Sequence, residues 1–445
     1  MNTDIPAAPA PVSRSEAFAY WLKLGCISFG GPAGQIALMH EELVERRRWI
    51  SEQRFLHALN YCMVLPGPEA QQLATYIGWL MHRSWGGLVA GGLFVLPSLL
   101  LLIALSGAYM AWGQVPVVAG LFDGIKPAVT AIVVVAAHRI GSRVLKNGWL
   151  WGIAVAAFIG LFALKLPFPA IVLAAGVAGY VGGRFRPDKF ALGGGHGAAV
   201  RTAAPALIDD DTPTPPHACF SWPRFVRVLG LGLLLWALAL GALALALGRD
   251  AVLTQMGWFF TKAALLTFGG AYAVLPYVYQ GAVDQFGWLT APQMIDGLAL
   301  GETTPGPLIL VVSFVGFVGA WTHQIFGPDA RFAAGAAAAC VVAFFTFLPS
   351  FVFIFLGGPF IESTHGKLQF TAPLTAITAA VVGVIVNLAL FFAYHVLWPD
   401  GLSGDVRWLS ALIGLAAAVA LFRFKVSVIR VVLAAGLVGV AASLL

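Results

Sequence analysis

The sequence predicts an all-α, polytopic membrane protein. Of its 445 residues, 59% are apolar and 10% are charged, whereas soluble domains are roughly 45–50% apolar and about 25% charged. The apolar residues form blocks of about 20, which is the helix length that crosses a hydrocarbon layer roughly 30 Å thick. Windows of about 19 residues predict about 13 transmembrane segments. This pattern excludes disordered, fibrous, coiled-coil and disulfide-scaffold proteins.

A second observation is an internal repeat. A shift of 239 residues superimposes Phe29-Gly30-Gly31 on Phe268-Gly269-Gly270, and Pro66-Gly67-Pro68 on Pro305-Gly306-Pro307. Each triplet type, FGG and PGP, occurs only at these two places. We therefore expect two homologous halves, each with about six segments.

The repeat divides the chain into units. We expect a disordered tail at residues 1–14, a first transport repeat at 15–183, a flexible polar linker at 184–227, a connecting transmembrane helix at 228–248 and a second transport repeat at 249–445. The linker contains GGGHG and DDDTPTPP, which cannot build a core. The connecting helix makes the second half begin on the opposite side of the membrane, so the two repeats have inverted topology. Inverted repeats around a site near the midplane are typical of secondary transporters.

The basic residues indicate orientation rather than nucleic-acid binding, because they lie in short loops between apolar blocks. We assign 13 Lys and Arg to loops on the side of the N-terminus and 8 to the opposite side. Cytoplasmic loops carry the excess, so we expect a cytoplasmic N-terminus and a periplasmic C-terminus. Arg54 and the Arg46–Arg48 triplet are both assigned to the opposite side, and the triplet is the exception that weakens the count. Because the triplet follows several glutamates, an amphipathic surface helix is an alternative there.

The FGG and PGP triplets break helices within apolar surroundings. Non-helical backbone at membrane depth is tolerated only where protein or water satisfies its polar groups, so the breaks indicate a lined cavity. Pro68 and Pro307, in the first turn of the following helices, leave the next N–H groups free. These donors, in Glu69–Gln71 and Leu308–Leu310, and the helix dipole favour an anion. The alternative is a simple kink or tight loop.

Charged residues near the breaks are further candidates. Lys23 and Lys262 are matched by the repeat and could neutralise a dianion. Each lies near the start of its segment, so snorkelling to the interface is the alternative. Glu69 and Glu302 are proton-coupling candidates, because a carboxylate at a helix start competes with an anion until it is protonated. The alternative for both is an ordinary capping or first-turn acid. Gln71 could donate to an oxyanion.

No pattern indicates an enzyme. The chain has no CxxC, HExxH, GxSxG or Walker A motif, so we expect no catalytic residues, metal ligands or cofactor. The candidate substrate-binding residues are Lys23, Gly30, Gly31, Pro66, Gly67, Pro68, Gln71, Lys262, Gly269, Gly270, Pro305, Gly306 and Pro307.

The blocks that carry these triplets resemble a known family. SFGGPAGQIALMHEELVERRRWISEQRF…LPGPEAQQ and LTFGGAYAVLPYV…GETTPGPLILVV are similar to the two halves of long-chain chromate ion transporters, the CHR family. The resemblance implies a carrier in the bacterial inner (plasma) membrane that exports chromate, acts as an antiporter driven by the proton motive force, and confers chromate resistance. It implies chromate or sulfate, protons and the lipid bilayer as partners, with a homodimer as the candidate assembly and no nucleic acid.

Two other hypotheses stay open. One is a carrier of the same architecture whose substrate is sulfate or another oxyanion. The other is a membrane-embedded enzyme or structural protein, for which the sequence contains no motif.

Overall fold

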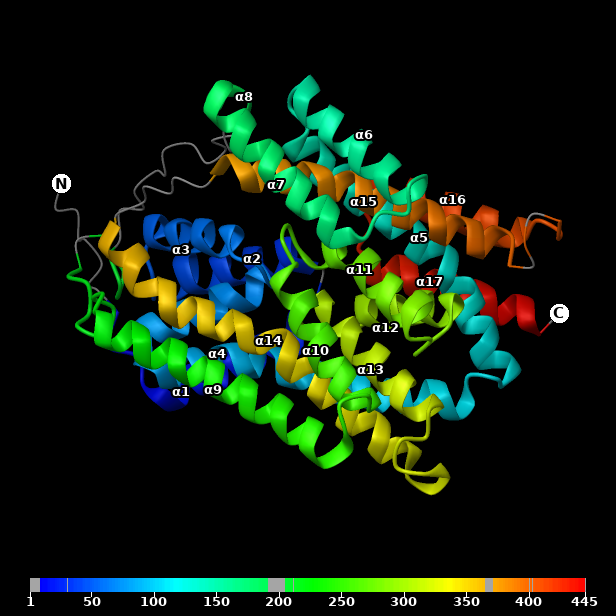
Figure 1. The fold of residues 1–445 in the computed structure, drawn as a ribbon, viewed down its shortest axis with the longest axis horizontal. Coiled ribbons are helices and arrows are strands. Elements are labelled where there is room, and N and C mark those ends of the chain that lie inside the picture. The colour runs from blue at the N-terminus through cyan, green and yellow to red at the C-terminus, as the bar shows by residue number, and fades with distance from the viewer. Residues whose placement is uncertain are drawn as a thin grey trace, which may run out of the picture.

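The protein is a bundle of helices, many of which run along the longest axis of the molecule (Figure 1). The computed structural model describes residues 9–29, 31–190, 205–210, 212–364, 371–399, 401 and 403–444. Within these ranges the regular structure is helical, apart from one isolated bridge between Ile50 and Ile208. The predicted all-helical, polytopic character is confirmed.

Among the described residues, six helices are long and apolar enough to cross a membrane. They are α4 (Glu69–Trp112), α5 (Pro116–Val144), α7 (Phe168–Phe185), α9 (Trp222–Leu247), α14 (Arg331–Thr364) and α15 (Thr371–Leu397). The described ranges also contain four shorter apolar helical stretches, one of which is Leu308–Thr322. The other three pack beside the long helices and are α6 (Gly148–Phe162), α16 (Trp408–Phe422) and α17 (Val428–Ser443). A four-residue helix, α8 (Pro187–Phe190), follows α7.

The first break produces a helical hairpin instead of a crossing. Helix α1 (Arg14–Ile27) ends before the FGG triplet, and α2 (Gly31–His40) continues into a π-helical segment, η1 (Glu41–Arg46). The free ends of the two arms meet, because Arg47 Nη1 lies 3.4 Å from Glu16 Oε1. At 14 residues, α1 is about 21 Å long, which is shorter than the hydrocarbon layer. The arms therefore enter and leave at the same end of the molecule.

The second break produces another hairpin. Helix α3 (Glu52–Val64) leads to the PGP triplet, and the first part of α4 returns as far as a kink at His82 and Arg83. His82 Nε2 lies 2.8 Å from Val12 O, next to the start of α1. The kink therefore brings the chain back to the end where α1 begins, and the rest of α4 then runs to the opposite end.

The second half repeats this order. It contains α10 (Val252–Leu265), α11 (Ala271–Tyr279), η2 (Gln280–Gln285), α12 (Ala291–Thr303), η3 (Leu308–Leu310), α13 (Val311–Thr322) and η4 (Pro328–Ala330) before α14. The bounds of η2 and α12 are those of η1 and α3 shifted by 239 residues. Trp288, just before α12, packs against Gly319 near the end of α13, so these two helices also form a hairpin.

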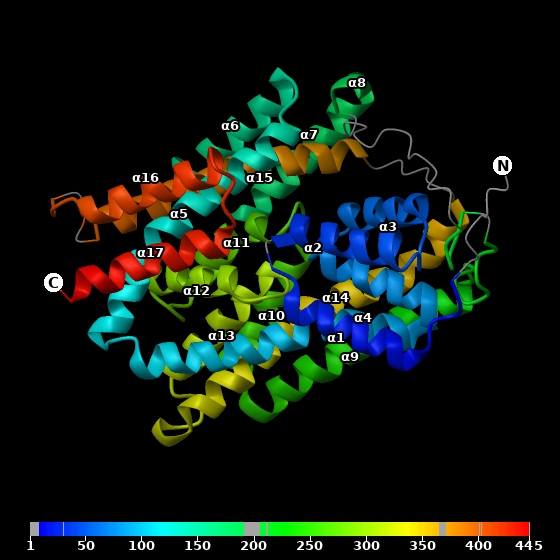
Figure 2. The same cartoon turned by 180° about the vertical axis from the view of Figure 1, so that it is seen from behind.

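We call the two extremities of the long axis the first end and the second end (Figures 1 and 2). The first end holds the start of α1, η1, the kink in α4, the start of α9 and the end of α14. The second end holds the ends of α4, α15 and α17. The sequence assigns Arg46–Arg48 and Arg54 to the side opposite the N-terminus, and the structure corrects this. Arg47 pairs with Glu16 and Arg54 pairs with Glu362, both at the first end, because the first two segments are hairpins.

Part of the predicted flexible linker is bound to the first end. The described part of the linker begins at residue 205 and runs past Ile50, where Ile208 forms the isolated bridge. Ser51 N–H donates to Ile208 O at 2.9 Å. His217 Nε2 lies 2.9 Å from Trp79 O, and burial lowers the pKa of the imidazole below its usual value. The connecting helix begins at Trp222, earlier than predicted. Residues 191–204 of the predicted linker and residues 1–8 of the predicted tail lie outside the described residues.

Cysteine labelling distinguishes hairpins from crossings. In a background without Cys26, Cys62, Cys219 and Cys340, we expect Ser13→Cys and Gln53→Cys to react with a membrane-impermeant maleimide from the same side. Asp405→Cys, in the segment between α15 and α16, should react from the other side only. Reaction of Gln53→Cys from the opposite side to Ser13→Cys would restore the sequence assignment.

Candidate functional site

Each PGP triplet lies against the FGG triplet of the other half. Gly67 N–H donates to Thr267 O at 2.7 Å, and Gly306 N–H donates to Ser28 O at 2.7 Å. Thr267 and Ser28 directly precede the two FGG triplets, and both pairs are related by the shift of 239 residues. A reciprocal contact of this kind is the signature of a local two-fold relation. We call this region the central junction.

Side chains complete the junction. Ser98 Oγ in α4 donates to Pro305 O. Gln72 Nε2 donates to Pro66 O at 2.8 Å and to Ser350 Oγ in α14 at 3.4 Å. Gln35 Nε2 donates to Ser28 O at 3.1 Å and to Gly306 O at 2.6 Å.

The polar side chains of the junction are buried. Ser28, Gln35, Gln72, Ser98 and Ser350 are all buried. The broken backbone therefore finds protein partners, as a membrane interior requires.

The backbone geometry of the junction requires glycine at the centre of each PGP triplet. Gly67 has φ +128° and Gly306 has φ +92°, a conformation that L side chains rarely adopt. A Cβ added at Gly67 would lie 2.5 Å from Ser350 Oγ and 2.6 Å from Gln72 Nε2. Any larger residue would displace the Ser350 hydroxyl of the other half or the Gln72 amide.

The helix starts differ from the prediction by one residue. Helix α4 begins at Glu69 with Pro68 as its N-cap, and η3 begins at Leu308 with Pro307 as its N-cap. The N–H groups of the first turn of α4, Glu69–Gln71, have no partner one helical turn earlier. Leu310 N–H donates to Pro307 O at 2.9 Å, so the prediction that it is a free donor is wrong.

The two carboxylates face the same helix. Arg143 interacts electrostatically with Glu69, and Arg139 does so with Glu302. Arg139 and Arg143 are four residues apart on α5 and share one of its faces. Tyr272 Oη donates to Glu302 Oε1. The structure therefore combines acidic, basic and phenolic groups beside the breaks.

The FGG glycines leave space at the breaks. Gly31, Gly269 and Gly270 have φ values of +71°, +79° and +96°. A Cβ added at Gly31 or Gly270 would have no atom within 4 Å. Gly30 lies outside the described residues.

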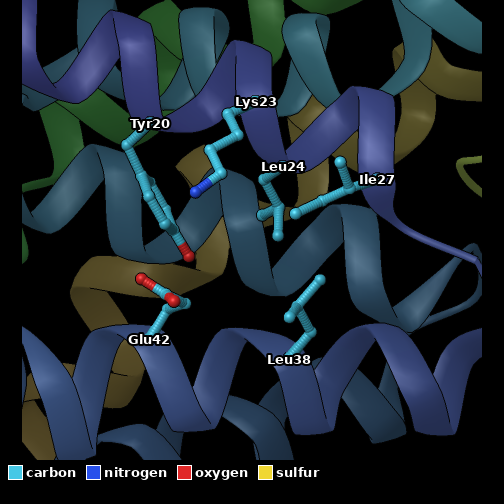
Figure 3. Close-up of a pocket in the computed structure, with 6 residues that line it drawn as sticks. All are labelled: Tyr20, Lys23, Leu24, Ile27, Leu38 and Glu42. Carbon is cyan, nitrogen blue, oxygen red and sulfur yellow. The ribbon is translucent and has the colours of Figure 1, made fainter.

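The two lysines are not brought together. Figure 3 shows Lys23 in a small pocket between α1 and the segment formed by α2 and η1, where Tyr20 and Glu42 also point inward. Lys262 Nζ lies 5.8 Å from the ring centroid of Trp258, which is closer to the start of α10. This is the snorkelling direction. Gln71 is buried and donates to Thr75 Oγ1 at 3.0 Å.

Several site residues were not identified from the sequence. Ser28 and Thr267 could have been found, since a hydroxyl residue precedes FGG in both halves, and Ser98 and Ser350 share the triplet Leu-Pro-Ser. Arg139 and Arg143 were counted as loop cations, because hydropathy ends the segment before them. The described ranges contain no group of three or more His, Cys, Asp or Glu side chains that could hold a metal ion.

Comparison with known proteins identifies relatives along most of the chain. The family model described as "Chromate transporter" matches residues 15–180 and 254–440. A chromate transport protein of Pseudomonas aeruginosa is 34% identical over 97% of this chain and 93% of its own length. One from Cupriavidus metallidurans is 29% identical over 95% and 92%, and a probable one from Synechococcus elongatus is 30% identical over 84% of each chain. No solved structure matches significantly.

We expect Gly67→Ala to disrupt the central junction. The strained φ and the close contact with Ser350 should lower the free energy of unfolding by about 1–3 kcal/mol. The measurement is thermal unfolding of the purified protein in detergent. Gly241→Ala in α9 is the matched control, because a Cβ there meets nothing within 4 Å. Equal melting temperatures for the two variants would contradict the prediction.

Proposed function

Because the chain belongs to the chromate transporter family, we propose that it is a secondary transporter that exports chromate across the bacterial inner membrane. The proton motive force drives export and the cell thereby resists chromate. The observation that carries this proposal is the match of the family model to both halves of the chain, on either side of the residues that join them. Relatives named as transport proteins support a carrier over an enzyme.

The proposed topology has nine crossings and four hairpins. The crossings are the six long apolar helices and the three shorter ones, α6, α16 and α17. Four crossings in each half return the chain to its starting side, and α9 carries it across between them, so the halves are inverted. With Arg46–Arg48 and Arg54 on the side of the N-terminus, and with Arg139 and Arg143 left out as site residues on α5, that side carries 15 of the assigned Lys and Arg, against four opposite. This supports a cytoplasmic N-terminus and a periplasmic C-terminus.

The proposed substrate site is the start of α4. The amides of Glu69, Ala70 and Gln71 are orphan donors at the positive end of a long helix, which favours an anion. Arg143 adds a full positive charge nearby. The corresponding start in the second half is lined by buried Leu308–Leu310, so its side chains supply no polar contact. One oxyanion per transport cycle follows from this difference.

Protons couple to the anion through Glu69 and Glu302. When ionised, Glu69 occupies the donors of the α4 start and holds the Arg143 charge. Protonation of Glu69 frees the amide donors and the Arg143 charge to bind a tetrahedral dianion such as chromate. Protonation of Glu302 likewise releases Tyr272 and the Arg139 charge, with which the ionised carboxylate interacts. Uptake of protons and movement of the anion are therefore linked.

Export can be measured as chromate uptake into everted membrane vesicles. We expect wild-type vesicles to accumulate chromate, an uncoupler to abolish the accumulation, and excess sulfate to compete. At least one of Lys23→Ala, Glu69→Gln and Glu302→Gln should abolish uptake while the protein remains in the membrane. Asp329→Asn, an exposed carboxylate in η4, is the matched control and should transport normally.

Three results would contradict the proposal in different ways. Unchanged uptake in all three variants removes the charged residues from the site. Accumulation that is insensitive to the uncoupler removes the proton coupling. Preferential uptake of radiolabelled sulfate over chromate would show that the protein is a sulfate carrier with the same architecture.

A further inference from the structure

A buried polar cluster joins the two halves at the first end. Arg54 Nη1 in α3 donates to Glu362 Oε2 in α14 at 2.9 Å, and Tyr76 Oη in α4 donates to Glu362 Oε1 at 2.5 Å. The Arg54 and Glu362 side chains are only 12% and 5% exposed. Arg54 Nη2 also donates to Thr212 O at 2.6 Å, so the segment that connects the halves is tied to the same cluster.

A second cluster joins the halves at the second end. Tyr109 Oη, near the end of α4, donates to Asp296 Oδ2 in α12 at 2.8 Å. Lys126 Nζ in α5 lies 3.6 Å from Asp296 Oδ1. Asp296 is 4% exposed, so here too a buried carboxylate of the second half is held by a phenol and a cation of the first.

The two clusters occupy corresponding places. Helices α3 and α12 correspond at a shift of 239 residues, and the Leu-Pro-Ser triplets of α4 and α14 correspond at a shift of 252. Each cluster therefore joins the second hairpin of one half to the long helix of the other. The hydrogen bonds of Gly67 and Gly306 lie between them at the central junction. Figure 1 shows this order along the long axis, with α3 toward one end and α12 beyond the centre toward the other.

We propose that the two clusters are the gates of the transport cycle, and that the halves rock about the central junction so that one gate opens while the other stays closed. The proposal rests on the transport function proposed above. With both gates closed, the structure described here corresponds to an occluded state.

The chemistry of the clusters suits a gate. Separating two apolar surfaces exposes them to water at a cost proportional to their area. A buried ion pair behaves differently, because the water that enters on opening solvates both charges and offsets the lost attraction. The contact therefore closes with a defined geometry and opens at small net cost. The central junction, made of backbone and side-chain hydrogen bonds between buried groups, is suited to remain closed throughout.

The chain supplies a reporter for the first gate. Cys62 in α3 is fully buried and lies two turns from Arg54, on the way to the central junction. With Cys26, Cys219 and Cys340 replaced by Ser, labelling of Cys62 by a membrane-impermeant thiol reagent measures opening at the first end. The matching position for the second gate is Gly301, at the same shift of 239 residues, where an added Cβ has 3.3 Å to its nearest neighbour.

Breaking each gate should give access from one side only. We expect Glu362→Gln to raise the labelling rate of Cys62 at least tenfold from the side of the first end, with no change from the other side. Asp296→Asn should do the same for Gly301→Cys from the side of the second end. The exchanged pair Arg54→Glu with Glu362→Arg restores the ion pair but not the hydrogen bond to Thr212 O, so it should return the labelling of Cys62 part of the way to its slow rate.

The control is Tyr61→Phe, which removes the hydrogen bond from Tyr61 Oη to Phe353 O between the same two helices, α3 and α14, without changing a charge. Its labelling rate should stay low. Faster labelling from both sides in the gate variants, faster labelling in Tyr61→Phe, or no change in any variant would overturn the gates.

Labelling and flux separate this proposal from the proposed function. The labelling assay contains no chromate, so it tests the gates alone. Sided labelling of a protein whose vesicles take up no chromate in the flux assay supports the gates and removes chromate as the substrate. Normal chromate uptake together with labelling that is not sided overturns the gates and leaves the substrate in place.

Discussion

A helix that stops inside a membrane leaves backbone N–H and C=O groups without partners, and each half of this protein supplies the partners for the other. The amides of Gly67 and Gly306 donate to the carbonyl oxygens of Thr267 and Ser28. Because hydrocarbon offers no replacement partner, neither half can satisfy its own broken helices alone. The reciprocal bonds therefore determine where the halves meet, and they allow the start of α4 to remain irregular at membrane depth.

The same constraint explains why the polar contacts between the halves differ between the centre of the molecule and its two ends. At the centre the contacts are short backbone and amide hydrogen bonds between buried groups. Toward each extremity the halves are joined by ionisable side chains instead, Arg54 with Glu362 and Lys126 with Asp296. Contacts that water can replace lie where water can arrive, and contacts that it cannot replace lie where it is excluded. A molecule organised in this way can change shape at its extremities without breaking its centre.

The sequence predicted the features that leave a local trace. Gly67 and Gly306 need a backbone conformation that few residues adopt, so the triplets that contain them stand out in both halves. Hydropathy could not predict that the first two segments are hairpins, because a hairpin and a crossing have the same apolar composition. The pair Arg54 and Glu362 joins residues 308 positions apart, and Arg143 comes within electrostatic range of Glu69 only once α5 is packed. Such contacts depend on the tertiary fold and have no pattern of spacing in the chain.

The differences between the halves are as informative as their likeness. The repeat retains the glycines and prolines that shape the breaks, yet Glu69-Ala70-Gln71-Gln72 in one half corresponds to Leu308-Ile309-Leu310-Val311 in the other. Backbone geometry must be retained in both copies, because each copy satisfies the other. With the anion site proposed at the start of α4, side-chain chemistry need be retained in only one, since a second equal site would place two anions beside each other at low dielectric, where repulsion is strong. A duplicated scaffold with a single polar helix start is the arrangement that these two requirements favour together.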